Sequence, residues 1–231
     1  MKNRGAGNIE FILAFVLFVS FTATALYFFS PVKNVQTLES SREYVEGAIV
    51  ANASVELESY SIIIDEDNHE NNIEVSLPGI SSTKSVRAVG YYGNLLESKR
   101  ETNSDRVCFS RSQERLIALY FSEDIEGEWG GCSGSAEGYE IASSTRANAI
   151  SEKKILQLKE RYSTNYSLLK KELGVPSGID FSFSFEFPDN ENITAERTIP
   201  LRREVFSDIQ TKEILRENGE LVFGYISVKV W

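Results

Sequence analysis

The chain has 231 residues, of which 42% are hydrophobic and 25% charged, and this length allows one folded domain or two small ones. Its 24 Lys and Arg stand against 34 Asp and Glu, so the formal net charge is −10. This excess of acid argues against a nucleic-acid binder, because such proteins need a basic stripe to follow phosphates. One His and two Cys are too few for catalytic zinc, iron–sulfur or zinc-finger sites. We therefore expect no metal, no cofactor and no nucleic-acid partner.

The apolar residues are concentrated near the N-terminus. Residues 11–29 read FILAFVLFVSFTATALYFF and contain no charge and no polar stripe at helical spacing. A helix of this length nearly matches a hydrocarbon core of about 30 Å, so the sequence predicts a single-pass transmembrane helix. Lys2 and Arg4 precede it, and Glu39, Glu43 and Glu46 follow it. The positive-inside rule then places the N-terminus in the cytoplasm and the C-terminal domain outside the cell membrane.

Three processing states fit this start. The segment is an uncleaved anchor, or a conventional signal peptide that is cut after Ala23-Thr24-Ala25. The hydrophobic run continues through residues 26–29, where polar residues are expected after such a cut. A third state is suggested by Gly5 and Glu10. A short basic leader ends at Gly5, and the single carboxylate of Glu10 directly precedes the apolar run.

The stretch MKNRGAGNIEFILAF resembles the type IV pilin-like signal, which is called a class III signal peptide in archaea. The resemblance implies that a prepilin peptidase-like enzyme cuts after Gly5, that Ala6 becomes the N-terminus, and that the helix stays on the mature protein. The commonest archaeal pattern has Gln and Ser where Ala6 and Asn8 stand, so a cut after Gly7 is the second option.

Residues 7–11 also resemble the start of TadE-like pseudopilins, in which small residues precede Glu and Phe. Both resemblances assign Glu10 and Phe11 to assembly. The implied partner of the Glu10 carboxylate is the terminal amine of a neighbouring pilin-like subunit, which compensates a charge that is costly in an apolar surrounding. The alternative places Glu10 at the headgroup level, where its charge costs little.

A second helical pattern follows Pro31. Apolar residues recur on one helical face at Val32, Val35, Leu38, Val45, Ala48 and Ile49. They predict an amphipathic continuation of the helix, with a short stalk as the alternative. The sequence then divides into a basic leader (1–5), a transmembrane or filament-core helix (6–30), the amphipathic continuation (31–50) and an extracellular β-rich head (51–231).

Within the head, β-rich runs separated by polar turns predict strands at Ser54–Ile64, Ile73–Leu77, Ser85–Tyr92, Arg106–Ser110 and Leu116–Phe121. Apolar spacings of three and four predict one helix in residues 150–173. Phe181–Phe187 alternates rings with polar residues, and Asn218-Gly219 predicts a hairpin between residues 208–216 and 220–231. We expect an α+β fold: a long N-terminal hydrophobic helix with an amphipathic half, packed on an antiparallel sheet with one additional helix. The order helix, Phe-rich strand and hairpin ending in Trp231 resembles archaeal pilin-like surface proteins.

Two cysteines of an exported chain usually pair, so we expect a disulfide between Cys108 and Cys132, with two buried thiols as the alternative. In the chain-entropy estimate the closed loop stabilises the fold by about 3–4 kcal/mol. The disulfide would fasten the glycine-rich segment 127–138. Trp129 within it either packs the loop on the core or offers a binding platform for a sugar or a protein.

Three sequons make Asn52, Asn165 and Asn192 candidates for glycosylation on an extracellular surface. Asp65–Asn72 is rich in carboxylates and amides but lacks the glycine and closing Glu of an EF-hand loop, so we expect a solvated turn with His69 exposed. Gly131-Cys132-Ser133-Gly134 lacks the nucleophile-elbow pattern. We therefore predict no enzymatic activity.

The pattern as a whole favours a membrane-anchored, pilin-like surface protein, a minor or specialised subunit of a filament or secretion system that assembles through its N-terminal helix. The alternative is an uncleaved single-pass protein whose extracellular domain binds a ligand or partner.

Overall fold

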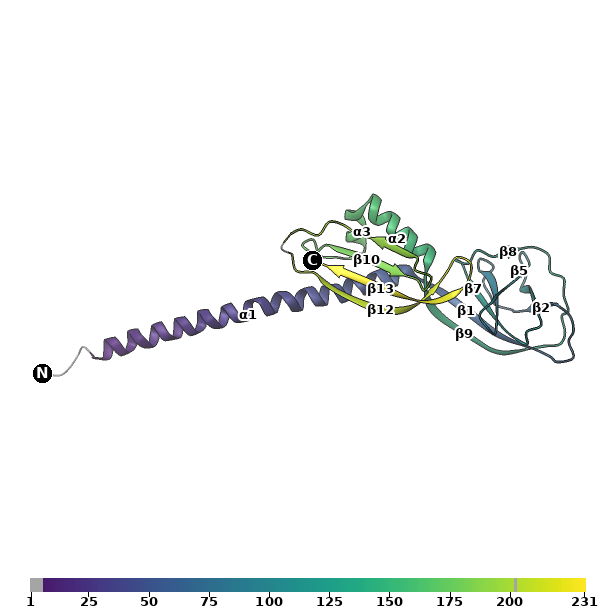
Figure 1. Cartoon of the computed structure of the whole chain (residues 1–231), viewed down its shortest axis with the longest axis horizontal. Coiled ribbons are helices and arrows are strands. Elements are labelled where there is room, and N and C mark those ends of the chain that lie inside the picture. Colours follow the sequence, from purple (N-terminus) through teal and green to yellow (C-terminus); the bar gives the residue numbers. More distant parts are fainter. Residues whose placement is uncertain (1–5, 202) are drawn as a thin grey trace.

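The computed structural model describes residues 6–201 and 203–231, with side chains described for residues 10–26, 38–201 and 203–231. Its helix α1 (Ala6–Ala53) projects from an elongated head, as Figure 1 shows. The end of α1 packs on the near part of the head, and α1 leads directly into the first strand.

Two sheets form most of the head. The larger has nine strands in the order β11-β10-β13-β12-β9-β1-β7-β3-β4, and the smaller has four in the order β2-β6-β5-β8. The strands are β1 (Ser54–Ile64), β2 (Asn72–Ser76), β3 (Ser85–Gly90), β4 (Leu95–Leu96), β5 (Ser98–Arg100), β6 (Arg106–Ser110), β7 (Leu116–Ser122), β8 (Glu128–Trp129), β9 (Tyr139–Ser151), β10 (Phe181–Glu186), β11 (Asn192–Ala195), β12 (Phe206–Leu215) and β13 (Leu221–Val230). Two helices, α2 (Glu152–Thr164) and α3 (Tyr166–Glu172), lie between β9 and β10.

The predicted α+β class is wrong, because strands outnumber helices in the chain. The head has two sheets instead of one antiparallel sheet, and the larger contains parallel pairing between β9 and β12. The predicted transmembrane helix is not found: in the described part of the chain, no helix is both long and apolar enough to cross a bilayer. The one additional helix is also wrong. Asn165 divides it, since its backbone N–H donates to the carbonyl of Arg161 and its side chain accepts from the N–H of Leu168.

The nine-stranded sheet joins two regions with separate cores. The proximal region contains the end of α1, α2, α3 and β10–β13, and the distal region contains β1–β8 and most of β9 (Figure 1). Between β9 and β12 the ladder holds only the pairs Ile214↔Ile150 and Leu215↔Ser151. A small apolar cluster of Val55, Leu57, Ile125, Ala149 and Leu215 fills this junction.

The proximal core forms around the aromatic strand β10. The predicted ring face is present: Phe181, Phe183, Phe185 and Phe187 are all buried against the helices. Tyr162 of α2 contacts these rings edge to face and donates its hydroxyl to the carbonyl of Phe181 at 2.6 Å. This hydrogen bond lets a buried phenol satisfy its polar end, as buried tyrosines usually do.

The distal core lies between the two sheets and also holds cations. Arg100 is 2% exposed, and its guanidinium donates to the carbonyls of Ser81, Lys84 and Ile80. Burial lowers the pKa of Arg100, and the charge of Asp105 opposes this shift. These three carbonyls accept three of the five N–H groups of a guanidinium that is costly to desolvate.

Candidate functional site

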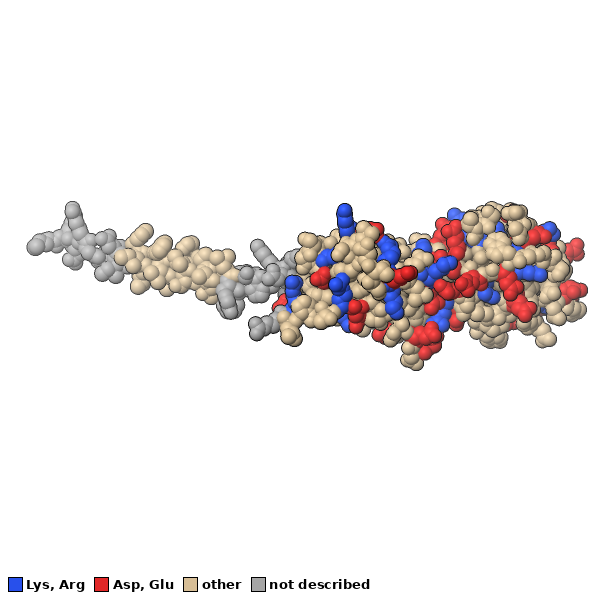
Figure 2. Space-filling model, turned by 90° about the horizontal axis from the view of Figure 1, so that it is seen from above, with Lys and Arg blue, Asp and Glu red and all other residues tan. Residues whose placement is uncertain are grey.

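Among the described residues, the longest series of exposed large apolar side chains lies on α1. We call it the α1 apolar surface and define it by the large apolar side chains that α1 exposes near its start: Phe11, Ile12, Leu13, Phe15, Val16, Leu17, Phe18, Val19, Phe21 and Leu26. Neighbouring helical residues differ by 100° in direction, so this series surrounds the helix. Figure 2 shows the stretch free of charge beside a head covered with both signs of charge. Exposed apolar patches of this extent mark a binding surface.

The other end of α1 is fixed to the proximal region. Val45, Ile49 and Ala53 are fully buried there. Arg42 pairs with Glu46 at 2.6 Å and with Asp208 of β12 at 3.4 Å, which links the helix to the sheet. The α1 apolar surface is therefore carried on a helix whose other end belongs to the folded head.

The predicted processing and assembly residues lie at the start of α1. Gly5 is outside the described residues, and Ala6 is the first residue of α1, with its side chain outside the described set. The Glu10 side chain is exposed, and Phe11 beside it is 75% exposed. Both predicted assembly residues are therefore accessible to another molecule.

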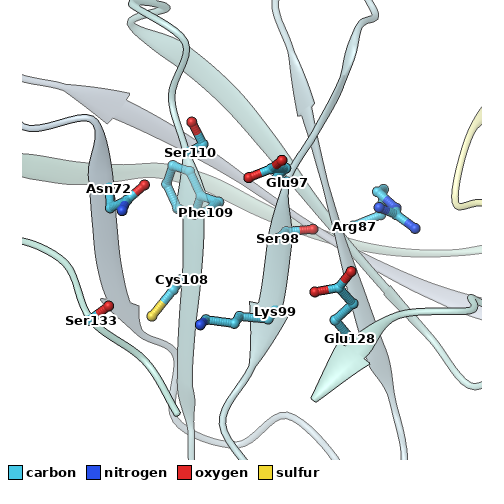
Figure 3. Close-up of a pocket in the computed structure, with 10 residues that line it drawn as sticks. All are labelled: Asn72, Arg87, Glu97, Ser98, Lys99, Cys108, Phe109, Ser110, Glu128 and Ser133. Carbon is cyan, nitrogen blue, oxygen red and sulfur yellow. The ribbon is translucent and has the colours of Figure 1, made fainter. Parts of the chain in front are cut away.

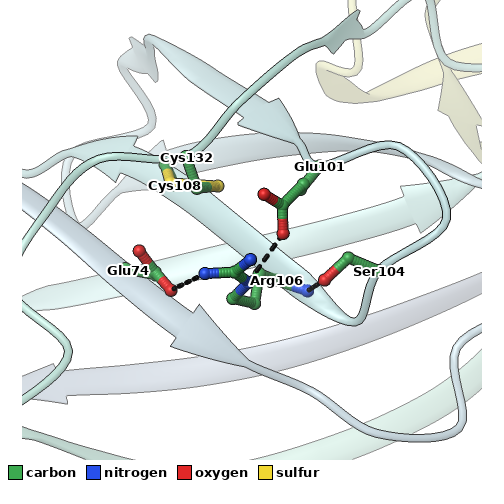
Figure 4. The surroundings of a disulfide bond; sticks show 6 residues. All are labelled: Glu74, Glu101, Ser104, Arg106, Cys108 and Cys132. Carbon is green, nitrogen blue, oxygen red and sulfur yellow. Dashed lines mark hydrogen bonds and ion pairs between the residues drawn. A yellow bond between two sulfur atoms is a disulfide. The ribbon is translucent and has the colours of Figure 1, made fainter.

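The predicted disulfide between Cys108 and Cys132 is confirmed. It joins β6 to the segment after β8, with the two Cα atoms 5.6 Å apart. Near it, Arg106 of β6 pairs with Glu74 of β2 at 3.2 Å and with Glu101 at 2.6 Å, and its N–H donates to Ser104 (Figure 4). The hydrogen bond to Glu74 and then the charge of Glu101 raise the pKa of Arg106. The disulfide and these ion pairs together hold the small sheet in place.

A polar cavity of about 330 Å³ lies beside the disulfide (Figure 3). Its walls carry cations and carboxylates, with Arg87 and Lys99 among the cations and Glu97 and Glu128 among the carboxylates. The Oγ of Ser98 accepts the N–H of Ala88, which fixes that wall to β3. With its charges balanced, the cavity favours neither an anion nor a cation.

A cluster that sequence analysis missed lies on one face of β1. Lys84, 8% exposed in its side chain, pairs with Glu56 and, at 2.5 Å, with the buried Glu58, and Arg146 reaches Glu58 at 3.3 Å. Burial opposes the charge of Lys84, but its hydrogen bonds to the two carboxylates raise its pKa. The spacing of Glu56 and Glu58 on alternate strand positions is the only sequence signal for it.

The remaining candidates are separate from one another. Asn52 lies in the last turn of α1, Asn165 caps α3 and Asn192 begins β11, and all three side chains are exposed. Trp129 is 40% exposed with its ring 5.6 Å from the Arg100 guanidinium, so it packs its loop on the core while keeping one side open. His69 is exposed in the connection between β1 and β2. Among the described residues, no three or more His, Cys, Asp or Glu side chains are placed to hold a metal ion.

Comparison of the chain with known family models, with curated proteins and with solved structures gives no match. Among the features of the described residues, the α1 apolar surface has the clearest chemical consequence, because it leaves many large apolar side chains uncovered.

Proposed function

We propose that this protein is a pilin-like surface protein, a minor or specialised subunit of a type IV pilus-like filament or secretion system. The observation that carries the proposal is the α1 apolar surface, which extends from a folded head on a helix of the same chain. A helix that is apolar on all sides is stable only when other apolar groups cover it. Other pilin-like subunits, packed side by side through α1, supply that cover.

In this proposal the protein starts at the cell membrane, with its N-terminus cytoplasmic and its head extracellular, and then enters a surface filament. A prepilin peptidase-like enzyme removes the leader after Gly5, so that the amine of Ala6 meets the Glu10 carboxylate of a neighbouring subunit. The exposure of Glu10 and Phe11 supports this pairing, because neither side chain is used within its own head. No metal, cofactor or catalytic group takes part.

Cleavage of the leader is tested by measuring the intact mass of the protein extracted from membranes of its source cells. We expect an N-terminus at Ala6, or at Asn8 if the cut follows Gly7. Replacement of Gly5 with Leu blocks the first cut and leaves the second, so a comparison with Gly7→Leu separates the two. Recovery of intact Met1 as the sole form contradicts the cleaved subunit and favours the uncleaved anchored domain.

Assembly is tested by Glu10→Ala, with Glu39→Ala as the matched control, since Glu39 is also an exposed α1 carboxylate. We expect the amount of sheared filament to fall at least tenfold for Glu10→Ala and to stay near the wild-type amount for Glu39→Ala. Equal amounts for the two variants would remove the proposed charge pairing.

A further inference from the structure

A groove of about 520 Å³ lies on the outer face of the distal region, away from α1. Its floor is formed by Val89 of β3 and by Leu116, Ala118 and Tyr120 of β7. The turn after β3 forms one side, and Leu221 at the β12–β13 hairpin forms the other. The groove therefore lies where a hairpin from the proximal region reaches over the distal sheet.

Two exposed tyrosines stand at the rim of this groove. Tyr91 and Tyr92 are the central residues of the turn that follows β3, and they are 67% and 86% exposed. Their ring centroids are 5.1 Å apart with an interplanar angle of 81°, so the two rings form a corner. Adjacent aromatic rings that are exposed to water leave apolar area uncovered, and a ligand that covers this area gains free energy.

The turn holds this corner rigidly. The N–H of Gly93 donates to the carbonyl of Gly90 at 3.0 Å, and the Glu114 carboxylate accepts the N–H of Tyr91. Gly93 has a φ of +84°, which favours glycine, and a Cβ at Gly90 would clash with the Glu114 carboxylate. The backbone is thus built for close approach, and the rings are preorganised without any ligand.

Polar groups face the groove from the other sides. The hydroxyl of Tyr120 and the carboxylate of the half-buried Glu220 have no hydrogen-bond partner among the described residues, and Ser61 adds another hydroxyl. Burial, helped by the charge of Glu213, raises the pKa of Tyr120, so its hydroxyl keeps its proton and remains a donor at neutral pH. The groove therefore offers both a donor and acceptors beside apolar ring faces.

The charges of the lining define the ligand further. None of the described residues that line the groove is Lys, Arg or His, and Glu220 is their one carboxylate. An anionic ligand would find no cation there and would meet a negative charge. A neutral pyranose has an apolar C–H face for an aromatic ring and hydroxyls that both donate and accept. We propose that this groove binds a neutral saccharide, with Tyr92 as the stacking platform and Tyr120 and Glu220 as hydrogen-bond partners.

The test measures binding of neutral hexasaccharides (cellohexaose, maltohexaose, mannohexaose and chitohexaose) to the full-length chain in detergent, produced without N-glycosylation so that its own glycans cannot occupy the groove. Isothermal titration gives the affinity, and saturation-transfer NMR identifies the sugar protons near a ring. We expect at least one of the four to bind with a sub-millimolar Kd. Absence of binding for all four overturns the proposal.

Tyr92→Ala removes the platform and, because the side chain is 86% exposed, leaves the core intact. We expect at least tenfold weaker binding for Tyr92→Ala and less than threefold change for Tyr92→Phe, which keeps the ring. Tyr44→Ala, at a tyrosine on α1 that is 54% exposed and not part of the groove lining, is the control and should leave the Kd unchanged. Equal Kd values for wild type and Tyr92→Ala would place the sugar elsewhere, and equally tight binding of hexagalacturonate would refute the preference for a neutral ligand.

Discussion

The proximal and distal regions are stabilised by cores of different composition. The proximal core is aromatic and covered by helices, with three phenylalanines of β10 fully or almost fully buried under α2. The distal core is aliphatic, lies between two sheets, and is supplemented by a disulfide and by buried cations with their partners. The comparison indicates that the distal region, built from short strands, depends on a disulfide and on ion pairs for part of its stability. The proximal sheet, which helices cover, obtains its stability mainly from apolar burial. Since few ladder pairs connect the regions, we expect them to unfold as two units.

The two tryptophans make this comparison measurable. Trp231 is buried in the proximal region, where its backbone exchanges two hydrogen bonds with Asp180, and Trp129 belongs to the distal region. The chain has no other tryptophan. A Trp129→Phe background therefore reports on the proximal region alone, and a Trp231→Phe background on the distal region.

The largest expected effect comes from Phe183→Ala. The ring is 1% exposed and contacts Tyr162 and Phe185, so its removal leaves a cavity and should lower the free energy of unfolding by about 4 kcal/mol. Urea unfolding followed by Trp231 fluorescence should shift to lower denaturant, while the Trp129 transition stays in place. Phe109→Ala, at the equally buried Phe of β6, should produce the opposite pattern. A shift of both transitions by the same amount for either variant would show one cooperative unit.

The next effect comes from replacing Cys108 and Cys132 together with Ser. Loss of the cross-link should lower the free energy of unfolding of the distal region by about 3 kcal/mol through the larger entropy of the unfolded chain. The Trp129 transition should shift and the Trp231 transition should not. Reduction of the wild-type protein with dithiothreitol should reproduce the shift. If Trp129 unfolds at the same urea concentration with and without the disulfide, the distal region does not depend on its covalent support.

The smallest expected effect is a loss of thermal stability at acid pH. Asp180 in the proximal region loses some hydration, which alone would raise its pKa, but hydrogen bonds from Lys170 and Tyr166 lower its pKa below the usual value of an aspartate. A carboxyl whose pKa is lowered by folding stabilises the native state above its unfolded pKa, and this contribution disappears as the pH falls through the folded pKa. We therefore expect the Trp231-reported Tm to fall between about pH 5 and pH 3, and to fall less steeply in Asp180→Asn.

The matched variant in the distal region is Glu56→Gln. The hydrogen bond from Lys84 lowers the pKa of Glu56, so the same sign applies there, and the acid dependence of the Trp129-reported Tm should flatten. If the Trp231-reported Tm falls with pH as steeply in Asp180→Asn as in the wild type, other carboxylates control the acid stability of the proximal region.

The sequence predicted elements whose residues obey a local rule. The bounds of β1 and β6 match the predicted ones, the Asn218-Gly219 hairpin joins β12 to β13, and the rings of β10 share a buried face. The segments β1 and β6 are β-rich runs followed by polar turns, β10 alternates rings with polar residues, and the hairpin carries turn residues with one strong preference. The disulfide followed from the number of cysteines and the expected compartment.

The rest depended on long-range contacts. The centre of β9 (residues 140–148) reads EIASSTRAN and is exposed on both faces, so no hydrophobic alternation marks it as a strand, and pairing with β1 alone defines it. The Lys84 cluster and the groove beside Tyr92 each combine segments that lie far apart in the chain. No local pattern could predict that Glu220 and Tyr91 line one groove, since they lie far apart in the chain and the strands next to them belong to opposite parts of the nine-stranded sheet.

The direct continuation of α1 into β1 determines how the head would respond to mechanical load. If α1 is pulled along its axis, the tension enters β1, which lies between β7 and β9 and pairs with both over most of its length. A force parallel to a strand shears its ladder bonds together instead of opening them one after another, so resistance is shared by two ladders. The aromatic core around β10 also bears part of this load, because α1 packs on it through Val45, Ile49 and Ala53 before the chain enters β1.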